Sequence, residues 1–476
     1  MIRNRLFGVF FGLFVCYLLT AQVNPVEVSI NWKKSIGRLT ADHWGINDSG
    51  NGFNFYNQAM ADFFSQYKPG VVRIHHANLV QKLVNTSTQH WDTVKIRSMF
   101  ENLTKTYKHD GRIMFTFDNC PDFISKTLPL TVDQEDKLAH FFAQFPVIIK
   151  KMGYRVDLYE FLNEKEGLYS KDYNAYWRLL NKIAVAMKTA DPTVKCGGTA
   201  MNYPTSDVYR GYIDNCHMNM DFVSCHMYAR GAPGKIPNSY DDVFTGKRAY
   251  RNQSLNAAGI SKYLKSKKLK NMEVILDEFN VQYVWTPYEP MHHNFRGASW
   301  MACFVKNVAL QGVNVMNIWN ADDGGSYGII GENYFSAPAN LYLLSNPYLR
   351  GKILQSDDST NQVEIIPIRN ANGSKSSLFV NRTANTVDLI NLNKVMQVRK
   401  MAELVGFRLD STTRVLNDNI YPTYRIDTIN SVTPVIKLNP WGMLLLTNNV
   451  KGIDNQNRDS ELQKSNRKLN KKINTK

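Results

Sequence analysis

The middle of the chain carries the stretch LYEFLNE at residues 158–164, and the stretch EVILDEFN follows at residues 273–280. Each is a short run of apolar and aromatic residues that ends in carboxylates, Glu164 in the first and Glu278 in the second, as a buried β-strand at a polar edge does. In a barrel of parallel strands, all C-terminal strand ends face one shared cleft. The two stretches therefore predict a pair of glutamates that meet across a single opening.

Six further short apolar runs have the same character, and longer helical patterns separate them. These predicted strands span residues 43–47, 70–75, 112–118, 194–199, 222–228 and 313–319. One predicted helix runs from Tyr173 to Thr189 and ends before Pro192. Strands that alternate with helices favour parallel βα units, and residues 43–319 have the length of a (β/α)8 barrel, about 250 residues or more.

After about residue 335 the pattern changes to short strands between turn residues, at 364–368, 377–381, 387–390 and 442–447. This pattern predicts a β-sandwich, which the alternating residues 26–30 are expected to join. The predicted fold class is thus α/β, a (β/α)8 TIM barrel with an accessory antiparallel β-sandwich domain. The predicted domains are the barrel at 41–334 and the sandwich at 335–450, with 22–40 as an N-terminal strand segment of the sandwich.

The N-terminus predicts a signal peptide over residues 1–21. Arg3 and Arg5 precede an apolar run at 6–19 that is too short for a membrane span, and Ala21 offers a cleavage site. We therefore expect a secreted or periplasmic protein with no stable membrane insertion after cleavage. A lipid anchor at Cys16 is the alternative, because Leu13 lies three positions before this cysteine.

The net charge of +16 is partly carried by residues 451–476, which hold eight Lys or Arg and three Asp or Glu. This segment has no apolar periodicity, so we expect a disordered basic tail. The remaining positive charge allows attraction to an anionic polysaccharide, and solvated surface lysines explain it equally well. The chain has no clustered arginine and aromatic motif, which disfavours a nucleic-acid partner. The oligomeric state is left open.

Cysteine and histidine spacing gives no sign of a metal site, and we expect no metal and no cofactor. Five cysteines remain after signal cleavage, an odd number without a CxxC pattern, and we expect mostly small buried residues. A metal-dependent hydrolase would need the pairs His75-His76 and His292-His293. Adjacent strand residues face opposite sides, so each pair offers one ligand to a common metal.

Polar and aromatic residues stand at the ends of most predicted strands, where core packing alone does not explain them. They are Arg73, His75, Asp118, Asn119, Asn163, Glu164, His226, Tyr228, Glu278 and Trp319. The C-terminal ends of barrel strands are where catalytic residues gather, so we expect these side chains to surround one cleft.

This set of residues resembles the clan A retaining glycoside hydrolases, most of all glycoside hydrolase family 39 and its relatives. The resemblance covers the organisation of residues 24–450 and rests on Asn163-Glu164, Glu278 and the pair His226-x-Tyr228. It implies a retaining O-glycosyl hydrolase, with Glu164 as acid/base and Glu278 as nucleophile of a double displacement.

The resemblance also implies substrate-binding roles. Asn163 would bind the sugar 2-hydroxyl, Arg73 would steady Glu278, and Trp319 would be a stacking platform. The full predicted substrate-binding set is Asn163, Arg73, His75, Asp118, His226, Tyr228, Trp285 and Trp319. The chain departs from the family in Lys165-Glu166-Gly167, where a proline usually follows the Asn-Glu pair. The loops at 230–250 and 283–296 would also shape the cleft, so xyloside and uronide specificities are not transferred.

The expected chemistry assigns different protonation states to the two glutamates. Arg73 and Tyr228 should lower the pKa of Glu278, and a less polar setting should raise that of Glu164. Strand alternation should turn Asp277 away from the cleft if Glu278 faces it, and Glu166 lies beyond the strand end.

The sequence therefore favours a secreted retaining glycosidase that acts on a plant or algal polysaccharide or its oligosaccharides. An anionic or anhydro-galactan is the alternative substrate, suggested by the positive charge and by the altered loop after Glu164. The alternative from another class is a non-catalytic carbohydrate-binding barrel, in which the glutamates only bind sugar hydroxyls.

Overall fold

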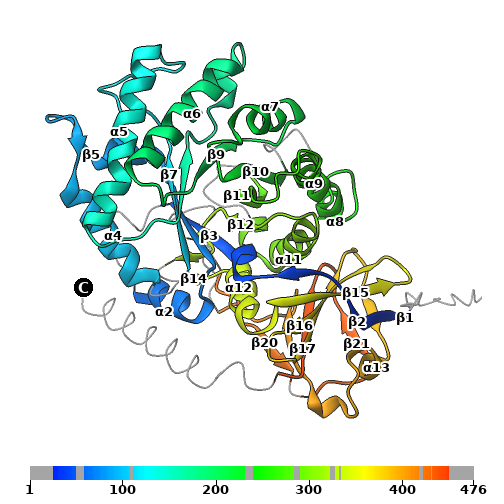
Figure 1. Ribbon diagram of the computed structural model, residues 1–476. Coiled ribbons are helices and arrows are strands. Elements are labelled where there is room, and N and C mark those ends of the chain that lie inside the picture. The colour runs from blue at the N-terminus through cyan, green and yellow to red at the C-terminus, as the bar shows by residue number, and fades with distance from the viewer. Residues whose placement is uncertain are drawn as a thin grey trace, which may run out of the picture.

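The computed structural model describes residues 25–49, 58–107, 111–230, 240–283, 290–321, 327–331, 334–416, 422–429 and 431–449. Its larger part is a closed barrel of eight parallel strands surrounded by helices (Figure 1), which confirms the predicted fold class. The barrel strands are β3 (Gly45–Asp48), β4 (Val71–Ile74), β7 (Arg112–Phe117), β8 (Leu158–Phe161), β9 (Cys196–Met201), β10 (Phe222–Arg230), β11 (Glu273–Gln282) and β12 (Val315–Ile318). They close in chain order, because β12 pairs with β3.

The main helices of the barrel follow its strands. They are α2 (Gln58–Tyr67), α4 (Thr93–Tyr107), α5 (Val132–Lys151), α6 (Tyr173–Ala190), α7 (Ser206–Cys216), α9 (Tyr250–Ser266), α11 (Phe295–Leu310) and α12 (Ala337–Tyr348). The helix predicted from Tyr173 is α6. It begins after Asp172, whose side chain accepts the backbone N–H of Ala175, and it ends before Pro192.

Short elements fill the connections of the barrel. They are η1 (Ala41–Trp44), α3 (Leu79–Leu83), β5 (Val84–Asn85), β6 (His90–Trp91), η2 (Glu166–Tyr169), α8 (Tyr240–Phe244), α10 (Pro290–His293), β13 (Ile330–Gly331) and β14 (Tyr334–Phe335). Among the helices of the described residues, none combines the length and apolarity that crossing a membrane requires.

The barrel interior is layered. Its lowest layer is an apolar cluster of Val71, Met114, Leu158, Phe222, Ile275 and Val315. The residue two positions later in each strand points the same way, because side chains alternate along a strand. These second positions are all buried and polar: Arg73, Thr116, Glu160, Ser224, Asp277 and Asn317. An apolar floor therefore supports a polar layer just below the C-terminal strand ends.

A second domain lies beside the barrel and consists of two sheets, which are antiparallel except for the parallel pair β1 and β18. The large sheet has the order β2-β15-β16-β17-β22-β19-β20, and the small one the order β1-β18-β21. Their bounds are β1 (Pro25–Val26), β2 (Val28–Leu39), β15 (Gly351–Asp358), β16 (Val363–Asn370), β17 (Lys375–Asn381), β18 (Val387–Leu389), β19 (Val405–Leu409), β20 (Asp427–Ile429), β21 (Ile436–Leu438) and β22 (Met443–Thr447), with α13 (Leu392–Met396) and η3 (Met401–Glu403) between them.

The large sheet is buried on both faces. Val363 and Ile365 belong to an apolar cluster shared with the small sheet, whereas Ile366 and Ile368 belong to the core of the barrel. In Figure 1 the blue strand β2 lies beside the yellow strand β15, although the whole barrel separates them in the chain. The N-terminal strands thus join the sheets of the C-terminal part.

One polar cluster joins the two domains. Glu364 on β16 accepts hydrogen bonds from Lys306 Nζ (2.5 Å) and Tyr250 Oη (2.5 Å) and pairs with Arg251 Nη2 (2.7 Å), while Asn307 donates to it at 3.3 Å. Lys306 and Asn307 lie on α11, and Tyr250 and Arg251 on α9. We call these five residues the interface cluster.

Several predictions lie outside the described residues, namely the signal peptide at 1–21, Cys16, the tail at 451–476 and Trp285. The exact domain boundaries stay predictions. In the described structure, α12 packs against the barrel helices α2 and α11, and the large sheet resumes at Gly351. The five described cysteines are buried, as expected, and the bridge at Cys120 or Cys216 that the sequence left open is not formed: Cys120, Cys196, Cys216, Cys225 and Cys303 are free.

Candidate active site

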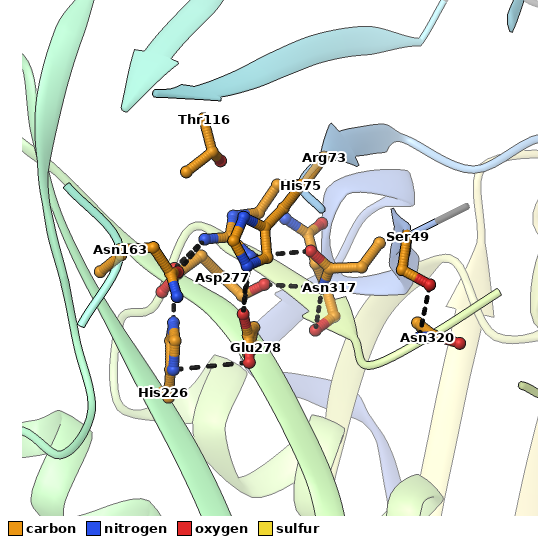
Figure 2. A network of polar contacts seen from close by, with 12 residues as sticks. Ser49, Arg73, His75, Thr116, Asn163, His226, Asp277, Glu278, Asn317 and Asn320 are labelled. Carbon is orange, nitrogen blue, oxygen red and sulfur yellow. Dashed lines mark hydrogen bonds and ion pairs between the residues drawn. The ribbon is translucent and has the colours of Figure 1, made fainter. Parts of the chain in front are cut away.

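Arg73, fully buried on β4, is the centre of a polar network near the C-terminal ends of the barrel strands (Figure 2). Its Nη1 donates to Glu278 Oε1 and to Asn47 Oδ1, both at 2.9 Å. Its Nη2 donates to Asn163 Oδ1 at 2.7 Å and lies 3.1 Å from Asp277 Oδ2. One guanidinium therefore fixes side chains from three other strands or strand ends.

Glu160 is a buried member of this network that the sequence reasoning did not identify as functional. Its Oε2 accepts from Arg73 Nε at 2.8 Å and from the Thr116 hydroxyl at 2.9 Å. Strand alternation could have revealed it, because Glu160 lies two residues after the inward-facing Leu158.

Asp277 and Glu278 both face the barrel interior, although they are neighbours on β11. Along the pairing with β10, Cys225 is opposite Leu276 and His226 is opposite Glu278, so Asp277 is an extra residue in a β-bulge. The prediction that Asp277 turns away from the cleft was wrong. Ile275 faces inward, so regular alternation already turns Asp277 inward, and the bulge brings Glu278 to the same side.

The two predicted catalytic glutamates lie on either side of one histidine nitrogen. His226 Nδ1 is 2.9 Å from Glu164 Oε1 and 3.4 Å from Glu278 Oε2. The distance between the two carboxylate oxygens therefore cannot exceed the sum of their distances to His226 Nδ1. On its other side, His226 Nε2 lies 3.1 Å from Asp277 Oδ2.

The two glutamates differ in their exposure. The Glu164 side chain is 41% exposed, whereas that of Glu278 is 8% exposed. Glu164 follows β8 with a positive φ of 54°, and this turn directs it toward His226. We call Arg73, Glu160, Glu164, His226, Asp277 and Glu278 the site network.

Two further predicted residues, Tyr228 and His75, lie beside Glu278, and a third, Trp319, lies beside His75. Tyr228 donates its hydroxyl to Glu278 Oε2 at 3.0 Å, and His75 Nε2 lies 3.8 Å from Glu278 Oε1. The rings of His75 and Trp319 are 5.4 Å apart, and Trp319 is half-buried. Tyr283, which is 52% exposed at the end of β11, meets Tyr228 edge to face. Aromatic rings thus lie on the side of Glu278.

Asp118 forms hydrogen bonds with the backbone of the segment that follows β4. Its two carboxylate oxygens accept the backbone N–H groups of Asn78 (2.7 Å) and Val80 (3.0 Å) at the start of α3. These bonds account for a buried carboxylate without a bound sugar, and they order the segment that follows β4.

The pKa directions of the two glutamates are opposite to the sequence-based expectation. Burial raises the pKa of Glu278, and the charges of His226 and Arg73 oppose this shift without overcoming it. Burial also acts on Glu164, but the hydrogen bond and the charge of His226 outweigh it and lower the pKa. These pKa directions follow from the number of charges in the site, where four carboxylates face two cationic groups.

The same balance affects the other members. Burial raises the pKa of Glu160 to about 7, with Asp277 adding to the shift and Arg73 opposing it. For Asp277, burial is outweighed by His226 and Arg73, which lower the pKa. Burial and the charge of Arg73 hold the pKa of His75 well below its usual value, so this ring is neutral.

The histidines considered for a metal site have other partners. His292 Nε2 bonds the Gln282 carbonyl at 2.6 Å, and His293 Nε2 bonds the Gly328 carbonyl at 3.0 Å. Nowhere in the described part of the chain do three or more His, Cys, Asp or Glu side chains come together as metal ligands.

Fold and site together define a barrel glycoside hydrolase. The model of glycosyl hydrolases family 39 matches residues 156–322, the segment from β8 to β12 that contains Glu164, His226 and Glu278. This match identifies the chain as a retaining O-glycosyl hydrolase and confirms the predicted resemblance to clan A, most of all to family 39. No curated protein matches the chain.

Solved structures share the fold at low sequence identity. A monomeric β-xylosidase from Caulobacter crescentus is 14% identical, with a TM-score of 0.62 over 88% of this chain and 99% of that one. An α-L-arabinofuranosidase from Thermotoga maritima in complex with arabinose is 13% identical, with a TM-score of 0.60 over 89% and 99%. A wild-type family 86 glycoside hydrolase in complex with neoagarooctaose is 15% identical, with a TM-score of 0.60 over 89% and 78%.

Proposed function

We propose that this protein hydrolyses O-glycosidic bonds in a plant or algal polysaccharide, or its oligosaccharides, by double displacement with Glu278 as nucleophile and Glu164 as acid/base. The observation that carries the proposal is the shared contact with His226 Nδ1. The two oxygens lie 2.9 and 3.4 Å from one nitrogen, and this closeness supports the separation of about 5–5.5 Å of a retaining pair over the about 6.5–9.5 Å that an inverting enzyme needs for a water molecule.

The surroundings of Glu278 suit a nucleophile. Arg73 and Tyr228 each hold one of its oxygens, which fixes the carboxylate and stabilises its charge when it attacks the anomeric carbon. Arg73 also holds Asn163, and in this proposal the amide of Asn163 binds the sugar hydroxyl next to the scissile bond.

The surroundings of Glu164 suit an acid/base that must exchange protons with a leaving group and then with water. It is the more exposed of the two glutamates, and its partner His226 can hold a proton. In the first step, Glu164 gives a proton to the glycosidic oxygen as Glu278 forms the glycosyl ester. In the second step, Glu164 takes a proton from the water that breaks this ester.

The substrate is proposed as a class. Trp319, Tyr228 and Tyr283 offer ring faces and edges along the cleft, and sugar rings stack on such surfaces. The solved structures of similar fold include a β-xylosidase, an α-L-arabinofuranosidase and a complex with neoagarooctaose. Aryl xylosides, aryl arabinofuranosides, xylan, arabinan, agarose and sulfated galactans therefore form the screen. We further propose that the protein acts outside the cytoplasm, because residues 1–21 have the pattern of a signal peptide.

The test is Glu278→Ala, assayed on the best substrate of this screen and on its activated aryl glycoside. Hydrolysis should be lost, and azide should restore turnover and give a glycosyl azide of inverted configuration, because azide replaces the missing nucleophile. Undiminished hydrolysis by Glu278→Ala would refute the two-glutamate mechanism.

The matched control is Glu273→Gln. Glu273 is on the same strand as Glu278 but at its opposite end, where it pairs with Arg112 at 3.0 Å. The N-terminal face of such a barrel serves stability, so this variant should keep its activity. Glycan binding without product by the unaltered protein, even after long incubation, would favour the carbohydrate-binding alternative.

A further inference from the structure

We propose that Asp277 is a positioning residue that, through His226, keeps one proton on the contact between His226 Nδ1 and Glu164 Oε1. This inference rests on the proposed function, because it explains how Glu164 receives the proton that it gives to the leaving group. Asp277 is not expected to contact the sugar, since it is fully buried below His226.

The first step of the argument concerns the side of His226 that faces Asp277. Asp277 Oδ2 lies 3.1 Å from His226 Nε2 and 3.1 Å from Arg73 Nη2. The charges of His226 and Arg73 lower the pKa of the Asp277 carboxyl, which contacts both groups, so it is ionised and can only accept hydrogen bonds. The His226 Nε2 atom must therefore carry a hydrogen, whichever charge state the ring has.

The second step concerns the side that faces Glu164. With Nε2 protonated, Nδ1 either carries a second hydrogen or presents a lone pair. A lone pair 2.9 Å from an ionised Oε1 would be repulsive, so the contact needs exactly one hydrogen between the two atoms. That hydrogen lies on Nδ1, beside a carboxylate, or on Oε1, beside a neutral ring.

Both arrangements have the same total charge and differ only in the position of one proton. In the first displacement, the Nδ1–H bond breaks as the Oε1–H bond forms, and Oε1 then gives its proton to the departing glycosidic oxygen. His226 is left neutral with its hydrogen on Nε2. In the second displacement, Glu164 takes a proton from the attacking water and returns it to Nδ1.

The charged and titratable groups around His226 together favour this shared proton. Those that face it or act on it are Asp277 and Glu278 from β11, Glu164 and Glu166 after β8, and Arg73 and His75 from β4. Burial lowers the pKa of His226, but the charges of Glu278 and Asp277 and two hydrogen bonds raise it well above its ordinary value. The acid proton therefore has a stable site although the pKa of Glu164 is lowered.

Asp277→Asn tests the inference, because the amide can also donate to Nε2 and so no longer fixes the hydrogen there. With 15N-labelled histidine, NMR of the wild-type protein should show His226 Nε2 protonated from pH 5 to 9. In Asp277→Asn, the titration of His226 should move to lower pH by about 1–3 units, since a charge in contact is lost. The signal is assigned by its loss in His226→Gln.

Kinetics give an independent measurement. For aryl glycosides of the sugar that the wild type cleaves, the basic limb of the kcat/KM profile should move to lower pH in Asp277→Asn. Rates with poor leaving groups should fall about 100-fold, whereas dinitrophenyl glycosides, which need no proton, should change little. Glu160→Gln is the control. It also removes a buried carboxylate from Arg73, but Glu160 accepts its hydrogen bonds from Arg73 and Thr116.

Two results would overturn the inference. One is a wild-type His226 whose Nε2 carries no hydrogen near neutral pH, which can be seen whether or not Asp277→Asn folds. The other is an Asp277→Asn enzyme that loses rate equally with both leaving groups and keeps its basic limb, as a merely disturbed site would. Activity retained by Glu278→Ala would refute the proposed function instead, and the NMR result would still decide where the proton lies.

Discussion

Glu278 in the site network and Glu364 in the interface cluster are both buried carboxylates that face cations, and their pKa values move in opposite directions. Burial disfavours the charge of Glu364, but Lys306 and Arg251 outweigh it and lower its pKa to about 2. Burial raises the pKa of Glu278 in spite of Arg73 and His226. The difference lies in the neighbours, because Glu278 also has Asp277 and Glu164 beside it.

This contrast separates two uses of buried charge. One carboxylate between two cations stays ionised over the whole physiological range and can hold two domains together. Four carboxylates around two cations cannot all be ionised with ease, so some of them bind protons near neutral pH. A site that must move protons during its reaction needs the second arrangement.

The largest effect on stability is expected from Glu364→Gln. Loss of this carboxylate leaves Lys306, which is 8% exposed, without its buried counter-charge, and breaking such a pair costs about 3–5 kcal/mol. The free energy of unfolding should fall by about this amount in urea titrations, while kcat of the folded enzyme stays the same. Glu278→Ala should show the reverse, with hydrolysis lost and the unfolding midpoint kept.

The control for this stability measurement is Glu273→Gln, which breaks a partly exposed ion pair with Arg112 and should cost under about 1 kcal/mol. If Glu364→Gln proved as stable as Glu273→Gln, the interface cluster would not be what holds the domains together.

A pH series on Glu160→Gln sharpens the comparison. The pKa of Glu160 is raised to about 7, above its ordinary value, so the folded protein binds a proton that the unfolded chain releases. The resulting stability is fully present below about pH 4.5 and is lost as the pH rises through about 7. Between pH 8 and pH 5, wild-type unfolding free energy should therefore rise by about 1–3 kcal/mol relative to Glu160→Gln.

Between pH 8 and pH 5, the unfolding free energy of Glu364→Gln should change with pH as that of the wild type does. The pKa of Glu364 is depressed, so its stabilisation is complete above about pH 4.5 and disappears only as the pH falls toward 2. Parallel curves for wild type and Glu160→Gln would mean that Glu160 does not titrate near neutral pH.

The smallest of these effects concerns one hydrogen bond at the nucleophile. Tyr228→Phe removes the donor that lies 3.0 Å from Glu278 Oε2. A hydrogen bond to a charged group contributes about 1.5–3 kcal/mol, so kcat/KM should fall about 10–100-fold. The acidic limb of the pH profile should move to higher pH, because the ionised carboxylate loses a partner.

Tyr212→Phe is its matched control. The Tyr212 hydroxyl is also buried, but it donates to the Phe222 carbonyl at 2.9 Å, at the start of β10 and not at its C-terminal end. It should change stability slightly and activity hardly at all. Equal losses of activity in both variants would show that Tyr228 supports the fold and not the nucleophile.

The sequence was sufficient for the parts of the fold and site that depend on local patterns. The eight barrel strands, the helix after Asp172 and the polar strand ends all follow from runs of apolar residues and their boundaries. For the same reason the sequence alone predicts that Glu164 and Glu278 lie together, because parallel strands bring their C-terminal ends together whatever lies between them.

What the sequence could not provide depends on contacts between strands. The bulge at Asp277 is a property of the pairing between β10 and β11, and it brings Glu278 to the same side of the strand as Asp277. The pKa directions depend on how many carboxylates share Arg73, which needs Glu160 and Asp277 in place. Glu160 could have been predicted from the sequence, since it lies two residues after Leu158 and therefore on the same inward face of the strand.

The placement of β2 beside β15 has a consequence for how the protein is made. Val28 pairs with Asp358 and Leu39 with Gly351, so β2 leaves the ribosome and lacks this partner strand until more than 300 later residues have followed. Its exposed edge is a hazard for misassociation during that wait. When β15 has been synthesised and pairs with β2, the chain segments before and after the barrel lie in one sheet. The sheet therefore cannot be completed until the barrel segment has been synthesised.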